Sequence, residues 1–346
     1  MINRNIIKNE VKVVVSISIF IMIFMICTSY IFLRSSTDYS NNFSLKDNLS
    51  INSSNNEVIV TGANKAKVYN KERESIEEID IEEYIMGVVS AEMQANFEIE
   101  ALKAQAIAAR TYYYAKRFEN CKEANGAEIC NSTHCQVYMT KEEILARWPE
   151  NKREEYWSKI NQAVNETKNQ VLLYNNEIVK YPQFFSTSSG KTENAVDVFS
   201  EDIPYLKSTE SLGEEVSPRY NESLEISKDN FINKINSSYN GANLNLVNLQ
   251  ESVNIISRTD GGSVKDIQLG SINISGTKFR SLFELNSANF TLEFKENTIV
   301  ISCKGYGHGV GMSQWGANIM ASQGKKYDEI LKHYYTGIDI GKVKFE

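Results

Sequence analysis

The sequence predicts an α+β protein, because helical and strand patterns fall in different parts of the chain. A long helical region with a 3.6-residue period runs from about Ile81 to Phe118, and Ser252 to Ile301 reads as strands joined by turns. An uncharged apolar run of membrane length, Val13 to Leu33, precedes both. We therefore expect an N-terminal transmembrane helix, a flexible tether, and an outer domain with an alanine-rich helical segment and a strand-rich C-terminal half.

The apolar run ends in bulky residues, Tyr30 to Leu33, whereas a cleavable signal peptide has a shorter run followed by small residues. We interpret it as an uncleaved anchor. Lys and Arg residues beside a membrane span favour the cytoplasmic side. Three of them, Arg4, Lys8 and Lys12, precede the run, and Arg34 follows it. The chain is predicted to be a single-pass cell-membrane protein, with a cytoplasmic N-terminus (1–12), an anchor (13–33), a tether (34–56) and an extracytoplasmic domain (57–346).

The tether prediction rests on Ser35 to Asn56, which is rich in Ser and Asn and has too few large apolar residues to offset the entropy of ordering. A second weakly patterned, Asn-rich stretch, Asn221 to Asn248, predicts a small inserted subdomain near 207–250. The net charge of −7 argues against a nucleic-acid partner, since phosphate binding needs a basic face.

The first helix is predicted to begin after Asp80, which with Glu83 forms a pattern similar to a capping box. Its apolar stripe, Ile81, Ile85 and Val88, continues four residues later to Glu92. A carboxylate therefore occupies a position where the periodicity expects a core residue. Burial raises the pKa of such a group and suits it to general acid catalysis, although an ion pair at the helix end is an alternative.

A second, alanine-rich helix is predicted from Glu100 to Arg110, with Lys103 and Arg110 on one face. Its small side chains allow close approach of a neighbouring helix or strand. Arg110 is a candidate ion-pair partner for Glu92 or for another acid. Further along, turns are expected at Asp260-Gly261-Gly262 and at Glu296-Asn297, each between two strands.

Four possible metal ligands lie within fifteen residues: Cys121, Cys130, His134 and Cys135. Three thiols and an imidazole are the ligand types that hold zinc in closed, structural sites, although the spacing matches no common zinc finger. The alternative outside the cytoplasm is a disulfide that joins Cys121 to Cys130 or Cys135. Either linkage would staple a loop just beyond the alanine-rich helix.

Two stretches, VVSAEMQANFEIEALKAQAIAARTYYYA (88–115) and GYGHGVGMSQWGANIMA (305–321), resemble the stage II sporulation protein D family. Shorter matches are STHCQVY (132–138), FFSTSSGKTENAVDVF (184–199), PYL (204–206) and ILKHYYTG (330–337). The resemblance covers about residues 57–346. Within it, Ser189 and Lys191 depart from the pattern of many relatives, and a Lys cannot supply the bidentate contacts of an Arg.

This resemblance implies a lytic transglycosylase of spore-forming bacteria. Such an enzyme cuts peptidoglycan between N-acetylmuramic acid and N-acetylglucosamine and forms a 1,6-anhydro sugar, during engulfment of the forespore. The family's catalytic glutamate falls on Glu92. The resemblance further implies glycan strands stripped of peptide stems as substrate, and an amidase and a multi-spanning membrane protein as partners. It places the outer domain between the mother-cell and forespore membranes.

Sugar-binding residues are expected in three stretches, namely the second helix, the hydroxyl-rich STSSG loop and the glycine-rich loop Gly305 to Ala317. Glycines there permit positive φ and bare backbone donors, although a tight hairpin followed by a helix near Ser313 is an alternative. The candidate substrate contacts are Lys103, Gln105, Arg110, Ser186, Ser188, Ser189, Thr192, His308, Gln314 and Trp315.

Two other functions are alternatives. A glycan-binding scaffold would keep the groove without turnover, and a zinc-dependent hydrolase would use Cys130, His134 and Cys135 as catalytic ligands. We expect zinc to be structural and expect no organic cofactor.

Overall fold

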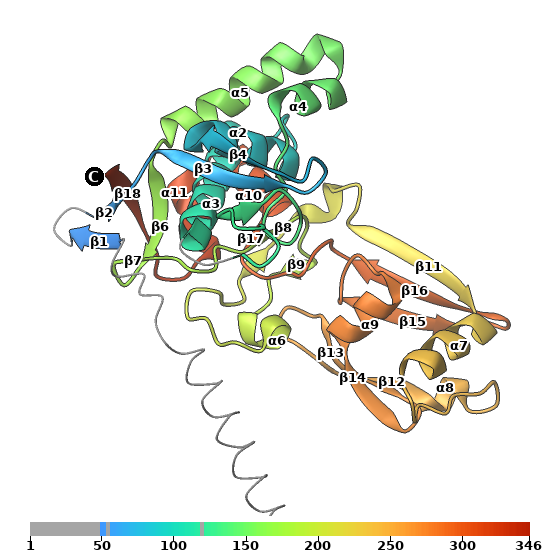
Figure 1. Ribbon diagram of the computed structural model, residues 1–346. Helices are drawn as coiled ribbons and strands as arrows, with labels where there is room; N and C mark the ends of the chain where they lie inside the picture. Colours follow the sequence, from blue (N-terminus) through green and yellow to red (C-terminus); the bar gives the residue numbers. More distant parts are fainter. Residues whose placement is uncertain (1–48, 53–55, 118–120) are drawn as a thin grey trace, which may run out of the picture. The chain divides into compact units, whose positions relative to one another are not determined.

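The computed structural model describes residues 49–52, 56–117 and 121–346. The predicted cytoplasmic segment, the anchor and most of the tether lie outside these residues. Within them, no helix combines the length and the apolar character that crossing a membrane requires. Both helices and strands are present, as the sequence predicts, but they are mixed throughout the described chain and are not confined to separate parts of it (Figure 1).

A five-stranded sheet joins the beginning and the end of the described chain. Its order is β1-β2-β18-β6-β7, in which β18 runs parallel to β2 and antiparallel to β6. The strands are β1 (Leu49–Asn52), β2 (Glu57–Val60), β18 (Asp339–Phe345), β6 (Gln170–Tyr174) and β7 (Glu177–Ile178). Strand β1 lies inside the range predicted as tether, so that part of the tether is a paired strand.

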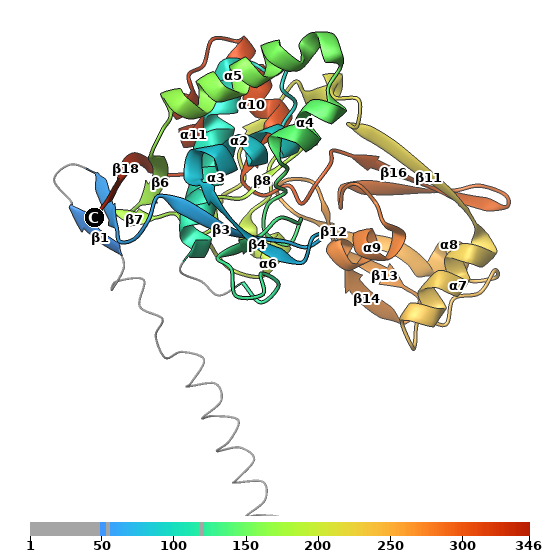
Figure 2. The same cartoon turned by 45° about the horizontal axis from the view of Figure 1, so that its top comes forward.

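A three-stranded sheet of order β4-β3-β5 leads into the helices. Its strands are β3 (Lys65–Asn70), β4 (Ser75–Asp80) and β5 (Ile129–Cys130). The helices of the first core are α2 (Ile81–Glu92), α3 (Ile99–Arg117), α4 (Lys141–Arg147), α5 (Arg153–Glu166), α10 (Gln314–Ser322) and α11 (Tyr327–Tyr334). A 3-10 turn, η2 (Glu150–Lys152), precedes α5. Helix α3 lies among the other helices of the first core in both views, and it contacts α2, α5, α10 and α11 (Figure 2).

Helix α2 begins as predicted, because the Asp80 carboxylate accepts a hydrogen bond from the Glu82 backbone N–H at 2.9 Å. The predicted stripe of Ile81, Ile85 and Val88 is fully buried. Alanine side chains along α3 are buried as well, which permits the close packing of its neighbours. One hydrophobic core results, built from residues between 58 and 206 and between 310 and 343.

A second core, built from residues between 231 and 303, occupies the sequence interval between the two portions of the first. It contains two three-stranded antiparallel sheets and three helices. The strands are β11 (Asn221–Ser227), β15 (Phe290–Phe294) and β16 (Thr298–Lys304), and then β12 (Val253–Arg258), β13 (Val264–Leu269) and β14 (Ile272–Ser275). The helices are α7 (Lys228–Ser238), α8 (Leu249–Ser252) and α9 (Gly276–Phe283).

Both predicted hairpins are confirmed, with β12 and β13 flanking residues 260–262 and β15 and β16 flanking residues 296–297. The inserted subdomain is longer than 207–250, because the Asn-rich range supplies β11 and α7 to a core that ends with β16. The Asn-rich range is polar because much of it is exposed: β11 is an edge strand, and most of its residues are exposed.

Short elements connect the two cores. They are β8 (Phe184–Phe185), β9 (Gly190–Lys191), α6 (Ala195–Phe199), β10 (Glu210–Ser211), η3 (Glu214–Val216) and β17 (Met312–Ser313). Strand β17 pairs in parallel with β8, and β9 pairs antiparallel with β10. The β8–β17 pair brings the STSSG loop beside the glycine-rich loop.

Candidate active site and metal centre

Glu92 is the last residue of α2, and its side chain is half-buried. The backbone N–H of Val137 donates a hydrogen bond to Glu92 Oε1 at 2.7 Å. Burial raises the pKa of the Glu92 carboxyl group, and the hydrogen bond from Val137 opposes this effect in part. The carbonyl end of the helix also disfavours a negative charge here. These are the surroundings that retain a proton on a carboxyl group for transfer to a substrate.

A cavity of about 360 Å³ opens beside Glu92. It is lined by Ala91, Glu92, Gln94, Phe97, Ser186, Ser217, Pro218, Arg219, Tyr306, Gln314 and Trp315. Glu92 is the one carboxylate and Arg219 the one cation among these lining residues. The predicted contacts Ser186, Gln314 and Trp315 are therefore brought together with the predicted acid.

Backbone hydrogen bonds hold the two loops of the cavity together. Thr187 and Tyr306 exchange N–H···O bonds of 3.0 and 2.8 Å, and the Trp315 N–H donates to the Ser186 carbonyl at 3.1 Å. At Gly311, φ is 79° and a Cβ atom would lie 2.0 Å from the Gln183 carbonyl oxygen, so a side chain is excluded. The glycines thus serve close loop packing, and α10 begins at Gln314, near the predicted helix start.

Trp315 packs edge-to-face on Phe97, with ring centroids 4.8 Å apart, and both rings line the cavity. Phe97 follows α2, so this contact joins the glycine-rich loop to the segment that carries Glu92. The Trp315 ring therefore both packs on a buried residue and belongs to the cavity wall.

Sequence reasoning missed a buried carboxylate, Glu214 in η3, which joins the STSSG loop to the glycine-rich loop. It accepts hydrogen bonds from the Ser188 N–H at 2.7 Å and the Ser313 hydroxyl at 2.6 Å, and also from the Ser211 hydroxyl. Burial raises the pKa of Glu214 to about 7, against the lowering effect of these donors. Nothing in the local sequence EEV distinguishes this acid from an exposed one, because its donors come from distant segments.

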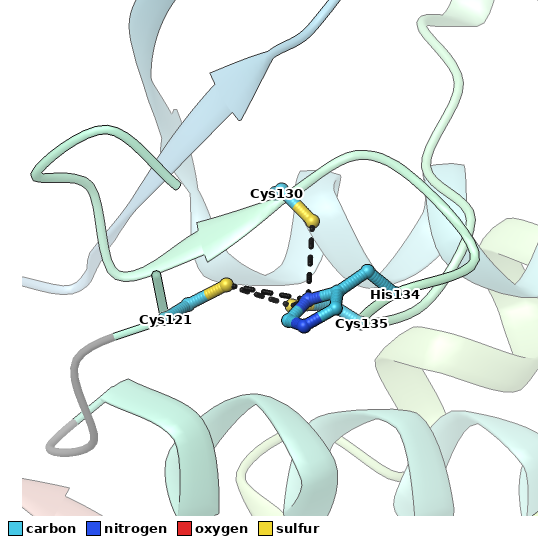
Figure 3. A group of neighbouring side chains, drawn as sticks. All are labelled: Cys121, Cys130, His134 and Cys135. Carbon is cyan, nitrogen blue, oxygen red and sulfur yellow. Dashed lines mark hydrogen bonds between the residues drawn. The ribbon is translucent and has the colours of Figure 1, made fainter. Parts of the chain in front are cut away.

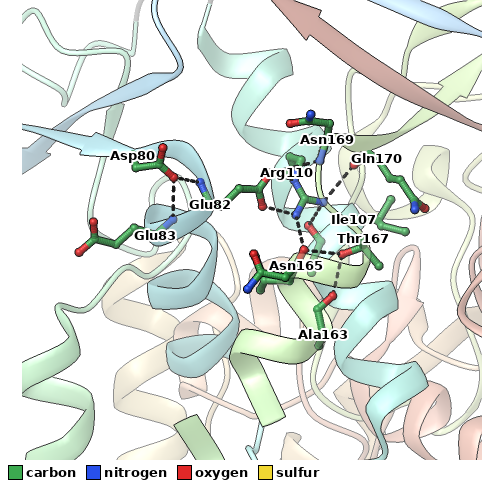
Figure 4. A network of polar contacts seen from close by, with 12 residues as sticks. Asp80, Glu82, Glu83, Ile107, Arg110, Ala163, Asn165, Thr167, Asn169 and Gln170 are labelled. Atoms are coloured by element: carbon green, nitrogen blue, oxygen red, sulfur yellow. Dashed lines mark hydrogen bonds and ion pairs between the residues drawn. The ribbon is translucent and has the colours of Figure 1, made fainter. Parts of the chain in front are cut away.

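Arg110 does not face the cavity. Its side chain is fully buried, and its Nε donates to Glu82 Oε1 at 3.0 Å while Nη2 bonds the other carboxylate oxygen (Figure 4). Nη1 donates to the Gln170 carbonyl at 3.1 Å. The open question of its partner is thereby answered with Glu82, and the prediction of a substrate contact at Arg110 is corrected to a bidentate ion pair inside the first core.

The other two predicted contacts on α3 are also occupied elsewhere. Lys103 Nζ forms ion pairs with Glu100 at 2.9 Å and Glu166 at 2.7 Å. Gln105 is fully buried among the alanine residues of α3. Neither residue lines the cavity.

The four remaining predicted contacts lie apart from Glu92: Ser188, Ser189, Thr192 and His308. Ser188 and Thr192 are buried, and the Thr192 hydroxyl accepts the Thr209 N–H at 2.9 Å. Ser189 accepts a hydrogen bond from the Asn289 amide at 2.9 Å. His308 packs between Phe185 and Phe199, and burial lowers its pKa to about 4. These residues support the loops and do not line the cavity.

The Cys/His cluster, defined as Cys121, Cys130, His134 and Cys135, gathers one ligand atom from each residue within 4.8 Å of the others (Figure 3). The cysteines of the cluster are free thiols, so neither disulfide considered from the sequence is formed. His134 directs Nδ1 toward the sulfur atoms at 3.5, 3.9 and 3.6 Å. On the other side of the ring, Nε2 lies 3.8 Å from the Glu123 carboxylate.

The shorter of these distances are those of a tetrahedral zinc site, and the longest, up to 4.8 Å, would have to shorten around an ion. Bond lengths of about 2.3 Å to sulfur and 2.1 Å to nitrogen place ligand atoms roughly 3.5 to 3.8 Å apart. The Cys121 and Cys135 sulfur atoms are 3.5 Å apart. A carboxylate beside the second ring nitrogen is the usual outer partner of a zinc-bound histidine. With four ligands available, the cluster can form a closed, structural site.

The Cys/His cluster is linked to the active-site candidate through the chain that follows it. Gln136 donates from its amide to the Tyr84 hydroxyl on α2 at 3.0 Å, and the next residue is Val137, which bonds Glu92. A cross-link at Cys135 would therefore fix the segment that supplies the backbone donor to the acid.

Sequence reasoning also missed Arg219 and Tyr306 as cavity residues. Tyr306 stands inside the resembling stretch 305–321 and could have been found from it. Arg219 follows Pro218 in a stretch that carries no recognised motif. The Arg219 Cζ atom lies 5.0 Å from the centroid of the Tyr306 ring, so the two residues act as one unit in the cavity wall.

Comparison with known proteins identifies the family of this chain. A family model described as stage II sporulation protein matches residues 69–174, a range that contains both Glu92 and the Cys/His cluster. Stage II sporulation protein D of Bacillus subtilis (strain 168) is 37% identical over 277 residues, which are 80% of this chain and 78% of that protein. Its counterpart in Bacillus amyloliquefaciens is 38% identical over 278 residues, with the same shares of 80% and 78%.

A more distant relative is the amidase enhancer of Bacillus subtilis (strain 168), 28% identical over 303 residues, which are 73% of this chain and 39% of that protein. The identity and coverage of the two stage II proteins decide the assignment. This chain belongs to the stage II sporulation protein D family, a family of sporulation proteins.

Proposed function

We propose that this protein is a lytic transglycosylase that cleaves peptidoglycan glycan strands between N-acetylmuramic acid and N-acetylglucosamine. The observation that carries the proposal is a single half-buried carboxyl group with a raised pKa in a cavity of about 360 Å³. Hydrolysing glycosidases normally need two carboxyl groups beside the scissile bond, one as acid and one as base or nucleophile. The residues that line this cavity include one, which favours a reaction that needs only one.

In the proposed reaction, the Glu92 carboxyl group donates its proton to the glycosidic oxygen as the C1–O bond of the muramic residue breaks. The Glu92 carboxylate then accepts the proton of the muramic C6 hydroxyl, while that oxygen bonds to C1. The product is a 1,6-anhydro sugar, the carboxyl group is protonated again, and no water is consumed. The Val137 N–H, 2.7 Å from Oε1, stabilises the carboxylate during the interval in which it is charged.

The polar and aromatic lining suits a sugar substrate. Ser186, Ser217 and Gln314 supply neutral hydrogen-bonding groups, and Trp315 supplies a stacking face. The acidic chain, with a net charge of −7, disfavours nucleic acid as the substrate.

Zinc is proposed as a structural ion held by the Cys/His cluster. The ion would supply a cross-link between β5 and the segment before Val137, and Glu92 would act without chemical help from it. A zinc-dependent hydrolase is disfavoured, because the cluster offers four ligands and does not line the cavity.

The setting is proposed from the sequence and from the family. An N-terminal anchor at residues 13–33 would place the domain outside the cell membrane, between the mother-cell and forespore membranes. Proposed partners are a multi-spanning membrane protein and an amidase that removes peptide stems beforehand. The name of one relative, amidase enhancer, supports the link with an amidase.

Mass spectrometry of digested glycan strands tests the proposal. Strands stripped of peptide and incubated with the full-length chain should release fragments that end in anhydro-muramic acid. Fragments that end in a reducing sugar would mean hydrolysis and would refute the one-carboxylate mechanism. Binding without release of any fragment would instead favour the glycan-binding scaffold.

A further inference from the structure

Arg219 is an exposed residue in the segment after η3, and it is the single cation that lines the Glu92 cavity. The side chains that share the lining with it are neutral apart from Glu92. An anion that entered the cavity would therefore be attracted by Arg219. Ionised Glu92 would repel it.

The Arg219 guanidinium is available for a ligand. Its Cζ atom lies 5.0 Å from the centroid of the Tyr306 ring, and within residues 56–117 and 121–346 it forms no ion pair with an acid. Arg110 and Lys103 differ in this respect, because carboxylates already occupy both of them. Stacking on Tyr306 restricts the Arg219 side chain and so lowers the entropy that it loses when it binds an anion.

We infer that Arg219 recognises the free carboxylate of the lactyl group on the muramic residue, and that this contact selects strands from which the peptide has been removed. The inference rests on the proposed function. In a strand that still carries its peptide, the lactyl carboxyl group is an amide and has no charge. In a stripped strand it is an anion, attached to the same sugar ring as the bond that Glu92 would cleave.

A guanidinium can hold a carboxylate through two parallel N–H···O bonds, which an ammonium group cannot reproduce. The neutral donors and acceptors of the cavity would bind sugar hydroxyls equally well in strands with and without peptide. Arg219 is therefore the residue in the lining that can distinguish the stripped strand from the peptide-bearing strand by charge.

The test measures binding, so that it does not depend on turnover. Calorimetric titrations would use the full-length Glu92→Gln protein and two probes, which are peptide-free glycan strands and the same strands with the muramic carboxyl groups chemically reduced to alcohols. Adding Arg219→Gln should weaken binding of the peptide-free strands by about 10- to 100-fold, the range expected for a charged hydrogen-bonded pair. Binding of the carboxyl-reduced strands should be unchanged within twofold.

Two further variants complete the experiment. Arg219→Lys should recover part of the lost affinity, because it keeps the charge and loses the fork. Arg147→Gln, on an exposed arginine in α4 outside the cavity lining, should bind both probes as the parent does. This matched control removes the same charge from the protein as a whole.

An equal loss for both probes on Arg219→Gln would overturn the inference, since the contact would not involve the carboxylate. Peptide-bearing strands, titrated as a third probe, give a further check: a larger loss for them would also overturn the inference, because the recognised carboxylate would then belong to the peptide. Neither outcome depends on whether the products of the wild-type chain carry anhydro ends, which is the separate test of the proposed function.

Discussion

A Glu92→Gln exchange removes one transferable proton from the cavity and leaves the surrounding contacts in place. The Gln side chain has the same length, and its Oε1 can still accept the Val137 N–H that now lies 2.7 Å from the carboxylate. The lining residues keep their positions, because none of the interactions that fix the loops uses the Glu92 side chain. We expect the variant to fold and to bind glycan.

The expected loss of activity follows from the role of the proton. A general acid contributes about 10²- to 10⁴-fold to a rate, which corresponds to about 2.7 to 5.4 kcal/mol in the activation barrier. Cleavage by Glu92→Gln should fall by at least the lower value. If Glu92 only shaped the cavity, an isosteric amide would cost far less.

Stability should change in the opposite direction at neutral pH. Burial raises the folded-state pKa of Glu92 above the ordinary value of 4.5, so the ionised form is disfavoured in the folded protein. The stability associated with this group is present below pH 4.5 and is lost as the pH rises through the folded-state pKa. The neutral Gln has no such loss, so its melting temperature at pH 7 should equal or exceed that of the wild type, and the difference should vanish at low pH.

The assay pairs product analysis with melting curves on the full-length chain. Glu98→Gln is the matched control, because Glu98 is an exposed residue between α2 and α3 and does not line the cavity. It should cleave peptide-free strands at the wild-type rate. Near wild-type cleavage by Glu92→Gln, or a collapse of its melting temperature at pH 7, would refute the reasoning.

Three further predictions test the supports of the site. Arg110→Ala leaves Glu82 buried without its partner and should lower the free energy of unfolding by about 3 to 5 kcal/mol in urea titrations, whereas lost turnover with unchanged stability would return Arg110 to the substrate site. Chelation of the proposed zinc should lower the melting temperature more than it lowers turnover by the folded fraction, and the reverse pattern would place the zinc in the chemistry. Glu214→Gln should flatten the dependence of melting temperature on pH: with a folded-state pKa of about 7, the wild type loses stability as the pH rises from 4.5 toward 7, and a variant with the same slope would contradict this role.

The first helix and the hairpins could be predicted from the sequence, because the signals that fix them are local. The Asp80 carboxylate caps the helix by accepting the backbone N–H of Glu82, two residues ahead. The stripe of Ile81, Ile85 and Val88 is a property of one helix face. The turns at 260–262 and 296–297 are set by Gly, Asn and Asp in the turns themselves. The Cys/His cluster was found for the same reason, since its four ligands lie within fifteen residues.

Partners that lie far apart in the sequence could not be predicted in this way. Periodicity places Arg110 on a helix face but does not tell whether that face meets solvent, a substrate or Glu82 on a neighbouring helix. Glu214 accepts from Ser188 and Ser313, which are separated from it by 26 and 99 residues. The sheet that joins β2 to β18 depends in the same way on pairing between the two ends of the described chain.

The cavity depends on two separate supports, and they differ in chemistry. On the side of the acid, the Cys/His cluster ends two residues before Val137, and Val137 contacts Glu92 directly, so the proposed zinc would fix this segment. On the side of the loops, the buried carboxylate of Glu214 joins Ser188 to Ser313, which caps the helix that begins with Gln314 and Trp315. Loss of the proposed zinc should therefore loosen the segment that carries Val137, and a rise in pH should disturb the loops that carry the proposed sugar contacts. A shift to high pH would then weaken affinity for the carboxyl-reduced strands as well as for the peptide-free strands, since the proposed loop contacts would reach every bound sugar ring and not only the charged one.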